Sequence, residues 1–215
     1  MTKPIDNNTE QKILDSATEV FHEKGYDGAR MQEIADKASI NKGLLHYYFK
    51  TKDSLFDAIF GMALNKMSAQ IQSILSLEVP LVEKIDLIIE GYMNMLAKNP
   101  FLPRFVLNEL NKNPDKFLAK HVNSSMKSTF SSFVKSVQKE VDAGHIRPID
   151  ARQLFINIIS LTIFPFIGRP MIQVFQGLNN KEFQVLIQER KNHIKAFVKQ
   201  ALRPWFFLFA VYPNG

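Results

Sequence analysis

The 215-residue sequence contains no cysteine. This absence excludes disulfide bonds, thiolate zinc sites and thiol nucleophiles. The N-terminus lacks a basic segment followed by an apolar run, so we expect no secretory signal peptide. The longest apolar run, Trp205 to Tyr212, is far shorter than the roughly 20 residues that a membrane-spanning helix needs. We therefore expect a cytoplasmic protein with no membrane partner.

The sequence also lacks recognisable catalytic patterns. Its five histidines are scattered, and none stands in the His-Glu-x-x-His pattern of a helical zinc site. No Gly-x-Ser-x-Gly elbow, P-loop or Gly-x-Gly-x-x-Gly motif occurs. We therefore predict no catalytic residues, no metal and no cofactor, which disfavours an enzyme.

The overall charge says little about partners. The net charge is +6, with 46% hydrophobic and 22% charged residues, which is ordinary for a globular protein with a sizeable core. Residues 1–56 carry eight Lys/Arg against nine Asp/Glu, and the remainder carries 19 against 12. Because salt screens charges beyond about 10 Å, local clusters are more informative than the total.

Nearly all of the sequence has the apolar spacing of helices, without strand alternation or internal repeats. A first helix is predicted to begin at the cap Thr9 and to stop at Gly25, and a loop at 26–30 leads to a second helix over 31–38. Later helices are predicted where proline and glycine leave uninterrupted periodicity. They cover roughly 81–98, 102–112, 115–143, 149–165 and 181–203.

The segment from Asn41 to Phe49 is the most informative part of the chain. Asn41 is a candidate cap for a short third helix, and Thr51 caps a long fourth one. Residues 37–52 contain four lysines (Lys37, Lys42, Lys50 and Lys52) and no acid. Two short helices joined by the tight Ser39-Ile40 connection, after a supporting helix, predict a helix-turn-helix unit. Cationic and tyrosine side chains on such a helix are suited to binding a phosphate backbone.

These residues carry a family resemblance. Over about residues 9–60 the chain resembles the TetR family of bacterial transcriptional repressors, and the later region agrees in length and helical character. The resemblance rests on Gly25-Tyr26, Ile34-Ala35, Lys42-Gly43, Leu45, Tyr48-Phe49, Lys50, Lys52 and Leu55. It implies an all-α fold, with an N-terminal three-helix helix-turn-helix domain followed by a helical ligand-binding and dimerisation domain.

The resemblance also implies boundaries and a mechanism. We expect a flexible arm at 1–8, a DNA-binding domain at 9–52, and a ligand-binding and dimerisation domain at 53–215. A homodimer would bind a palindromic operator, and a small effector would release it. The dimer is expected to form through helices near 149–165 and 181–203.

Carried over by position, the resemblance implies a set of DNA-binding residues. Leu44 stands where threonine is frequent, Arg30 replaces a capping serine or threonine, and Ser39 replaces a glycine. His46 and Tyr47 reverse the usual order of tyrosine and histidine. The predicted contacts are Arg30, Asn41, Lys42, Gly43, Leu44, His46, Tyr47, Tyr48, Thr51 and Lys52.

The middle helices are rich in phenylalanine and methionine, which suits an apolar or aromatic effector. Such residues are also common core residues, so each is only a candidate. The candidate ligand-binding residues are Met93, Met95, Phe105, Phe130, Phe133, Phe155 and Phe164. Two alternatives stay open: a helical small-molecule-binding protein without DNA binding, and, less favoured, an α-helical enzyme.

Overall fold

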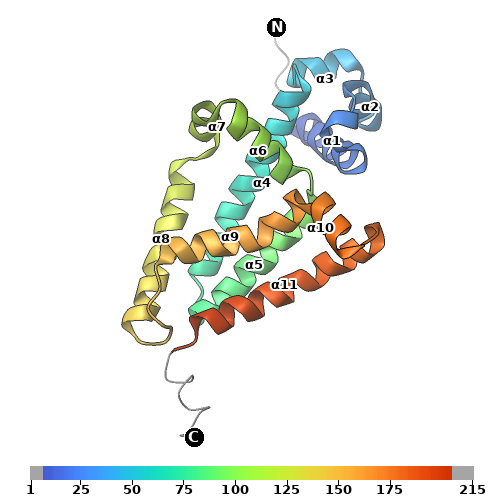
Figure 1. Cartoon of the computed structure of the whole chain (residues 1–215). Coiled ribbons are helices and arrows are strands. Elements are labelled where there is room, and N and C mark those ends of the chain that lie inside the picture. Colours follow the sequence, from blue (N-terminus) through green and yellow to red (C-terminus); the bar gives the residue numbers. More distant parts are fainter. Residues whose placement is uncertain (1–6, 205–215) are drawn as a thin grey trace, which may run out of the picture. The chain divides into compact units, whose positions relative to one another are not determined.

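The computed structural model describes residues 7–204, which form eleven helices and no strand (Figure 1). This confirms the predicted all-α fold. The chain divides into two compact units. Within the described residues, unit 1 comprises 7–66 and 98–121, and unit 2 comprises 67–97 and 122–204.

The elements divide between the units in an order that differs from the chain order. Unit 1 contains α1 (Asn7–Gly28), α2 (Met31–Lys37), α3 (Lys42–Tyr48), the first part of α4 (Lys52–Leu75), α6 (Leu102–Lys112) and α7 (Pro114–His121). Unit 2 contains the rest of α4 with α5 (Leu81–Lys98), α8 (Ser124–Asp142), α9 (Ala151–Ile167), α10 (Arg169–Gln176) and α11 (Asn180–Leu202). The compact units therefore do not follow a single boundary after residue 52.

Aromatic packing explains why α6 and α7 group with the N-terminal helices. Phe56 of α4 is fully buried, and its ring centroid lies 4.1 Å from that of Phe105 in α6. Phe60 of α4 stacks on Phe117 of α7 at 5.3 Å. Each such ring pair contributes roughly 0.5–1.5 kcal/mol beyond the area that it buries.

A polar contact supports the same packing. Asp57 of α4 accepts a hydrogen bond from Nε2 of the buried His121 at 2.5 Å, and Lys120 pairs with the other carboxylate oxygen. Both partners lie in the last turn of α7. This contact joins α7 to α4 alongside the ring cluster.

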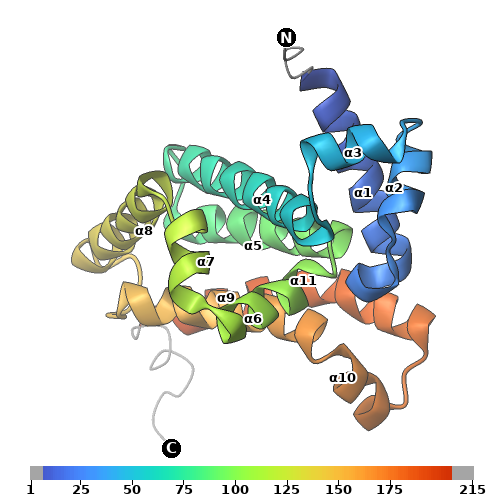
Figure 2. The same cartoon turned by 90° about the horizontal axis from the view of Figure 1, so that it is seen from above.

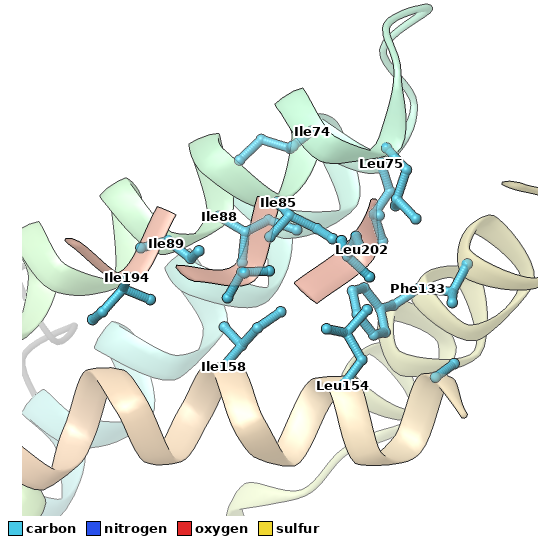
Figure 3. Close-up of a cluster of buried hydrophobic side chains, with 14 of the residues drawn as sticks. Ile74, Leu75, Ile85, Ile88, Ile89, Phe133, Leu154, Ile158, Ile194 and Leu202 are labelled. Carbon is cyan, nitrogen blue, oxygen red and sulfur yellow. The ribbon is translucent and has the colours of Figure 1, made fainter. Parts of the chain in front are cut away.

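The core of unit 2 is mostly aliphatic. Figure 3 shows side chains from α5, α8, α9 and α11 converging on one another, among them Ile85, Phe133, Leu154, Ile194 and Leu202. Each of these five side chains is at most 4% exposed. This burial accounts for the apolar stripes that the sequence displays in these helices.

The helix-turn-helix prediction is confirmed, and its turn explains the glycine position of the family. Ser39 has φ 55°, in the left-handed region, and is the only non-glycine residue in residues 7–204 with positive φ. The Ile40 N–H donates to the Ala35 carbonyl at 3.0 Å, which is the bond that closes a left-handed helix end. Ser39 adopts the conformation that glycine adopts without strain.

Several predicted boundaries were wrong. α1 begins at Asn7, so Thr9 lies inside the helix instead of capping it, and the helical assignment resumes after Gly25 to reach Gly28. Gly25 itself is non-helical, with φ 70° and ψ 175°, as expected for a helix stop. The single helix predicted at 115–143 is two helices, because the Asn123 side chain accepts the Met126 N–H at 3.0 Å and begins α8.

The region around Pro165 also differs from the prediction. Pro165 lies inside α9, which continues to Ile167, and α10 was not predicted. Proline has no N–H to donate to the carbonyl of residue i−4, which here is Leu161. Arg190 of α11 donates to that carbonyl from Nη2 at 3.4 Å, which offsets the missing bond.

Two expectations concern parts of the chain outside residues 7–204: most of the flexible arm at 1–8, and the apolar segment Trp205 to Tyr212. Among the described helices, none is by itself long and apolar enough to cross a membrane. By length and composition alone, α9 and α10 together would pass that test, as a pair bent by 74°.

We predict that Ser39→Gly stabilises the protein. Relief of a left-handed backbone at a non-glycine residue is worth roughly 1–2 kcal/mol, offset by about 0.4–1 kcal/mol from the greater freedom of the unfolded chain. Urea unfolding should therefore show a net gain of about 0.5–1 kcal/mol. Ser131→Gly, at an exposed position inside α8, is the matched control and should destabilise. Equal losses in both variants would contradict strain at Ser39.

Candidate nucleic-acid interface

Helix α3 depends on its surroundings for its shape. It has seven residues, which is too short to be stable alone in water. The Asn41 side chain accepts the Leu44 N–H at 2.7 Å, which confirms the predicted cap. Leu45 is fully buried and Phe49 is 7% exposed, so one side of α3 is held in the unit 1 core. The opposite side is consequently fixed in direction.

That opposite side carries the predicted contact residues. Tyr47 is 55% exposed and Leu44 36% exposed, while Tyr48 is half-buried with its ring edge-on to Tyr47 at 5.6 Å. Lys42 and His46 are exposed as well. α3 therefore presents Lys42, Leu44 and the rings of His46 and Tyr47 to solvent.

Gly43 and Thr51 act mainly on backbone geometry. A Cβ added at Gly43 would lie 3.2 Å from the Asn41 Oδ1, so a larger residue would crowd the cap. Thr51 Oγ1 accepts the Ser54 N–H at 3.0 Å, and Ser54 Oγ accepts the Thr51 N–H at 3.2 Å. This reciprocal pair begins α4, as predicted for Thr51.

His46 has a defined tautomer. Its Nδ1 lies 3.2 Å from the Lys50 carbonyl oxygen. A carbonyl oxygen only accepts, so Nδ1 must carry the hydrogen. Nε2 of this exposed ring then accepts a hydrogen bond when the ring is neutral and donates one when the ring is charged. The neutral ring can therefore bind a donor group through Nε2, but not a phosphate oxygen.

The four lysines of residues 37–52 separate into two pairs. Lys37 bridges Glu19 at 2.8 Å and Glu23 at 3.0 Å, and the hydrogen bond to Glu19 is the main cause of its raised pKa. Lys52 donates to the Tyr26 carbonyl at 2.7 Å and to the Ala29 carbonyl at 3.2 Å. Both lysines therefore hold unit 1 together.

Lys42 and Lys50 form the other pair. Both are exposed, and their side chains make no hydrogen bond or ion pair within residues 7–204. Lys50 was not among the predicted contacts, although it stands in the same acid-free segment. Its position in the short connection between α3 and α4 adds it to the candidate interface.

Arg30 precedes α2 with extended backbone (φ −117°, ψ 139°) and makes no side-chain cap, as its lack of an acceptor predicts. The guanidinium is exposed. Nearby, Lys24 lies 2.8 Å from Glu33 and lowers the pKa of that carboxyl group. This pairing neutralises the acid of the first turn of α2, which leaves Arg30 as the cation at that helix end.

The candidate ligand-binding residues do not all come together. Phe105 belongs to the ring cluster of unit 1, whereas the other six lie in unit 2. Phe155 is edge-on to Phe130 at 5.2 Å and to Phe133 at 6.0 Å, which places three of the candidates in one group from α8 and α9. Met93 belongs to the buried core, with Met95 packed against it, while Phe164 is 50% exposed.

Lys52 is predicted to be needed for stability. Replacing it with methionine leaves the Tyr26 and Ala29 carbonyls without their charged donor, which should cost roughly 1–3 kcal/mol in urea unfolding. Lys42→Met is the matched control, with the same loss of charge at an exposed lysine, and should change stability by less than about 0.5 kcal/mol. Equal stability of the two variants would show that the Lys52 contacts contribute nothing.

Comparison with known proteins agrees with this geometry. The profile of "Bacterial regulatory proteins, tetR family" matches residues 13–59, and that of "Tetracyclin repressor-like, C-terminal domain" matches residues 80–198. The chain is 22% identical to the fatty acid metabolism regulator protein of Bacillus subtilis over 180 residues, covering 82% of this chain and 92% of that protein.

Solved structures share the fold. PfmR, a TetR-family transcriptional regulator of Thermus thermophilus, superposes with a TM-score of 0.63 at 18% identity, covering 89% of this chain and 97% of that one. FadR of Bacillus subtilis in complex with stearoyl-CoA gives a TM-score of 0.61 at 18% identity, covering 90% and 99%. Since the two profiles together span most of the sequence, this chain belongs to the TetR family of bacterial transcriptional regulators.

Proposed function

We propose that this protein is a homodimeric repressor that binds a palindromic operator through α3 and is released by a small-molecule effector whose apolar or aromatic part binds in unit 2. The observation that carries the proposal is the outward side of the capped helix α3. Its residues, with the connection to α4, present Lys42, Leu44, His46, Tyr47 and Lys50 without any acid between residues 37 and 52.

The proposed contacts divide by chemistry. Lys42, Lys50 and Arg30 would bind phosphate groups, because their cationic side chains pair with phosphate oxygens. Such contacts are the same on any DNA sequence. Leu44 would touch a thymine methyl, since it cannot hydrogen-bond a base edge. Tyr47 would contact a phosphate or a base edge with its hydroxyl. Lys52 uses two donors within unit 1, so at most its remaining donor is available for DNA.

A homodimer would place two α3 helices in successive major grooves, about 34–36 Å apart. The exposed apolar residues of α9 and α11 support this partner: Ile156 is 53% exposed, Phe164 50% and Phe197 64%. Such residues are expected at the centre of an interface that a second copy covers. α9 and α11 lie against each other within unit 2, so both would contribute to one face.

The proposed effector site is the ring group of Phe130, Phe133 and Phe155 with the neighbouring Met95. Flexible and aromatic side chains of this kind accept apolar ligands of varied shape. A long-chain acyl-CoA is the first effector to test, because the similar FadR structure contains stearoyl-CoA. Release from DNA would require that the effector binds the DNA-incompetent conformation more tightly.

The DNA proposal is tested by selecting binding sites from a randomised duplex pool. An inverted repeat should emerge, and log affinity should fall linearly with log salt. Lys42→Met and Lys50→Met should each reduce the slope by roughly 0.9 per lost phosphate contact. Lys127→Met, an exposed lysine of unit 2, is the charge-matched control and should leave the slope unchanged.

Failure to bind any duplex at low salt would overturn the proposed repressor. It would favour instead a helical small-molecule-binding protein. Unchanged slopes for both lysine variants, with the wild type binding, would leave DNA binding in place but remove these two contacts.

The effector proposal is tested with stearoyl-CoA. Its addition should raise the melting temperature and weaken operator binding by about tenfold, within the usual range of allosteric coupling. Phe155→Ala should weaken the acyl-CoA effect while leaving operator affinity unchanged. Leu87→Ala, which truncates an exposed apolar residue of α5, is the control. Absence of any thermal shift with the wild type would exclude acyl-CoA as the effector class.

A further inference from the structure

The short helix α10 turns its apolar face outward. Its apolar residues Met171, Val174 and Phe175 stand at the i, i+3, i+4 spacing of one helix face. They are 45%, 78% and 79% exposed, and the helix has no buried residue. We call Met171, Val174 and Phe175 the α10 stripe. An amphipathic surface helix of a globular protein ordinarily turns its apolar stripe toward the core.

The polar side of α10 is bound to the protein instead. Arg169 donates from Nη2 to the Asn180 Oδ1 at 2.9 Å, and Gln173 donates from Nε2 to the same oxygen at 3.1 Å. The Arg169 guanidinium also lies 4.9 Å from the ring centroid of the buried Phe183. These contacts fix α10 against the first turn of α11.

The C-terminal end of α10 is defined as well. Gly177 has φ 64° and ends the helix in the left-handed conformation, and the Leu178 N–H donates to the Gln173 carbonyl at 2.9 Å. Fraying of the helix therefore does not explain the exposure of the α10 stripe. The outward direction of the stripe is part of the fold.

The location of α10 suggests what covers the stripe. It lies where the chain turns from α9 back into α11, at one end of that helix pair (Figures 1 and 2). α9 has 17 residues and α11 has 23, so α11 is longer by roughly 9 Å at 1.5 Å per residue. Because the Arg169 side chain contacts Asn180 and Phe183, α10 lies beside the first turn of α11.

We propose that the α10 stripe is part of the dimer interface and packs against a second copy of this chain. The inference rests on the proposed homodimer and extends its interface beyond α9 and α11. Exposed apolar residues flank α10 in the sequence: Phe164, in the last turn of α9, is 50% exposed, and Val185, in the second turn of α11, is 52% exposed. In a twofold dimer the stripe is presented twice, so each copy gains the contact.

The size of the contact supports this partner. A phenylalanine as exposed as Phe175 can bury on the order of 150 Å². A standard interface buries about 800 Å² per partner, so α10 adds a substantial share to the α9 and α11 face without replacing it. Well-packed apolar anchors of this kind carry most of the binding energy in an interface.

The test compares Phe175→Glu with Gln176→Glu, which introduces the same charge at the next exposed position of α10. Sedimentation velocity over a dilution series should show a dimer dissociation constant raised at least about tenfold for Phe175→Glu and changed less than about twofold for Gln176→Glu. Phe197→Glu in α11 reports separately on the proposed homodimer. Circular dichroism melting checks that each variant is folded.

A second measurement uses the absence of cysteine. Phe175→Cys introduces a single thiol, whose alkylation by a maleimide should slow as protein concentration rises through the dissociation constant. The thiol of Ser131→Cys, in α8, should react at a constant rate. This readout follows coverage of the stripe directly, so it remains informative if Phe175→Glu fails to fold.

The outcomes separate the two proposals. If Phe197→Glu dissociates the dimer while Phe175→Glu does not, and the thiol of Phe175→Cys reacts at a constant rate, the α10 inference is overturned and the homodimer stands. If the wild type stays monomeric at all concentrations, both fail. If Phe175→Glu leaves the dimer intact but abolishes binding to phosphatidylglycerol vesicles, a lipid surface is the partner and the inference is overturned.

Discussion

The candidate interface depends on the fixed orientation of a helix that cannot exist alone. α3 is seven residues long, and its shape comes from the Asn41 cap at one end, the buried Leu45 in the middle and Phe49 at the other end. A helix in water gains too little from one or two turns to overcome its nucleation cost. The direction in which Lys42, Leu44 and Tyr47 point is therefore a property of the unit 1 core. A helix backbone held this way loses little further freedom when its side chains bind a partner.

The cations around α3 serve two distinct purposes. Lys37 joins α2 to α1 through Glu19 and Glu23. Lys52 joins α4 to the end of α1 and the residue after it, through the Tyr26 and Ala29 carbonyls. The side chains of Lys42 and Lys50 contribute nothing comparable to the fold within residues 7–204. A charge cluster in a sequence thus combines residues that build the site with residues that can act in it. Only their hydrogen-bond partners distinguish the two groups.

The division into units bears on how an effector could influence DNA binding. α6 and α7 pack with the N-terminal helices through the Phe56, Phe105 and Phe117 rings, although they follow α5 of unit 2 in the chain. The covalent connections between the units are consequently three: the interior of α4, the end of α5 and the link from α7 to α8. α4 is a continuous helix through the first of these. Only Phe49, Lys50 and Thr51 separate the end of α3 from the start of α4.

The sequence by itself determined the local features whose causes lie within a few residues. Asn41 and Thr51 are caps because their side chains reach the amides of their own helix, and Ser39 takes a left-handed conformation because the turn requires it. Tertiary structure decided the features that depend on distant partners. Pro165 stays within α9 while Arg190, 25 residues later, donates to the Leu161 carbonyl, and Phe105 joins unit 1 because Phe56 lies against it. The same reason separates Lys52 from Lys42: periodicity shows that both are near a helix start, but not which carbonyls lie within reach of a lysine ammonium group.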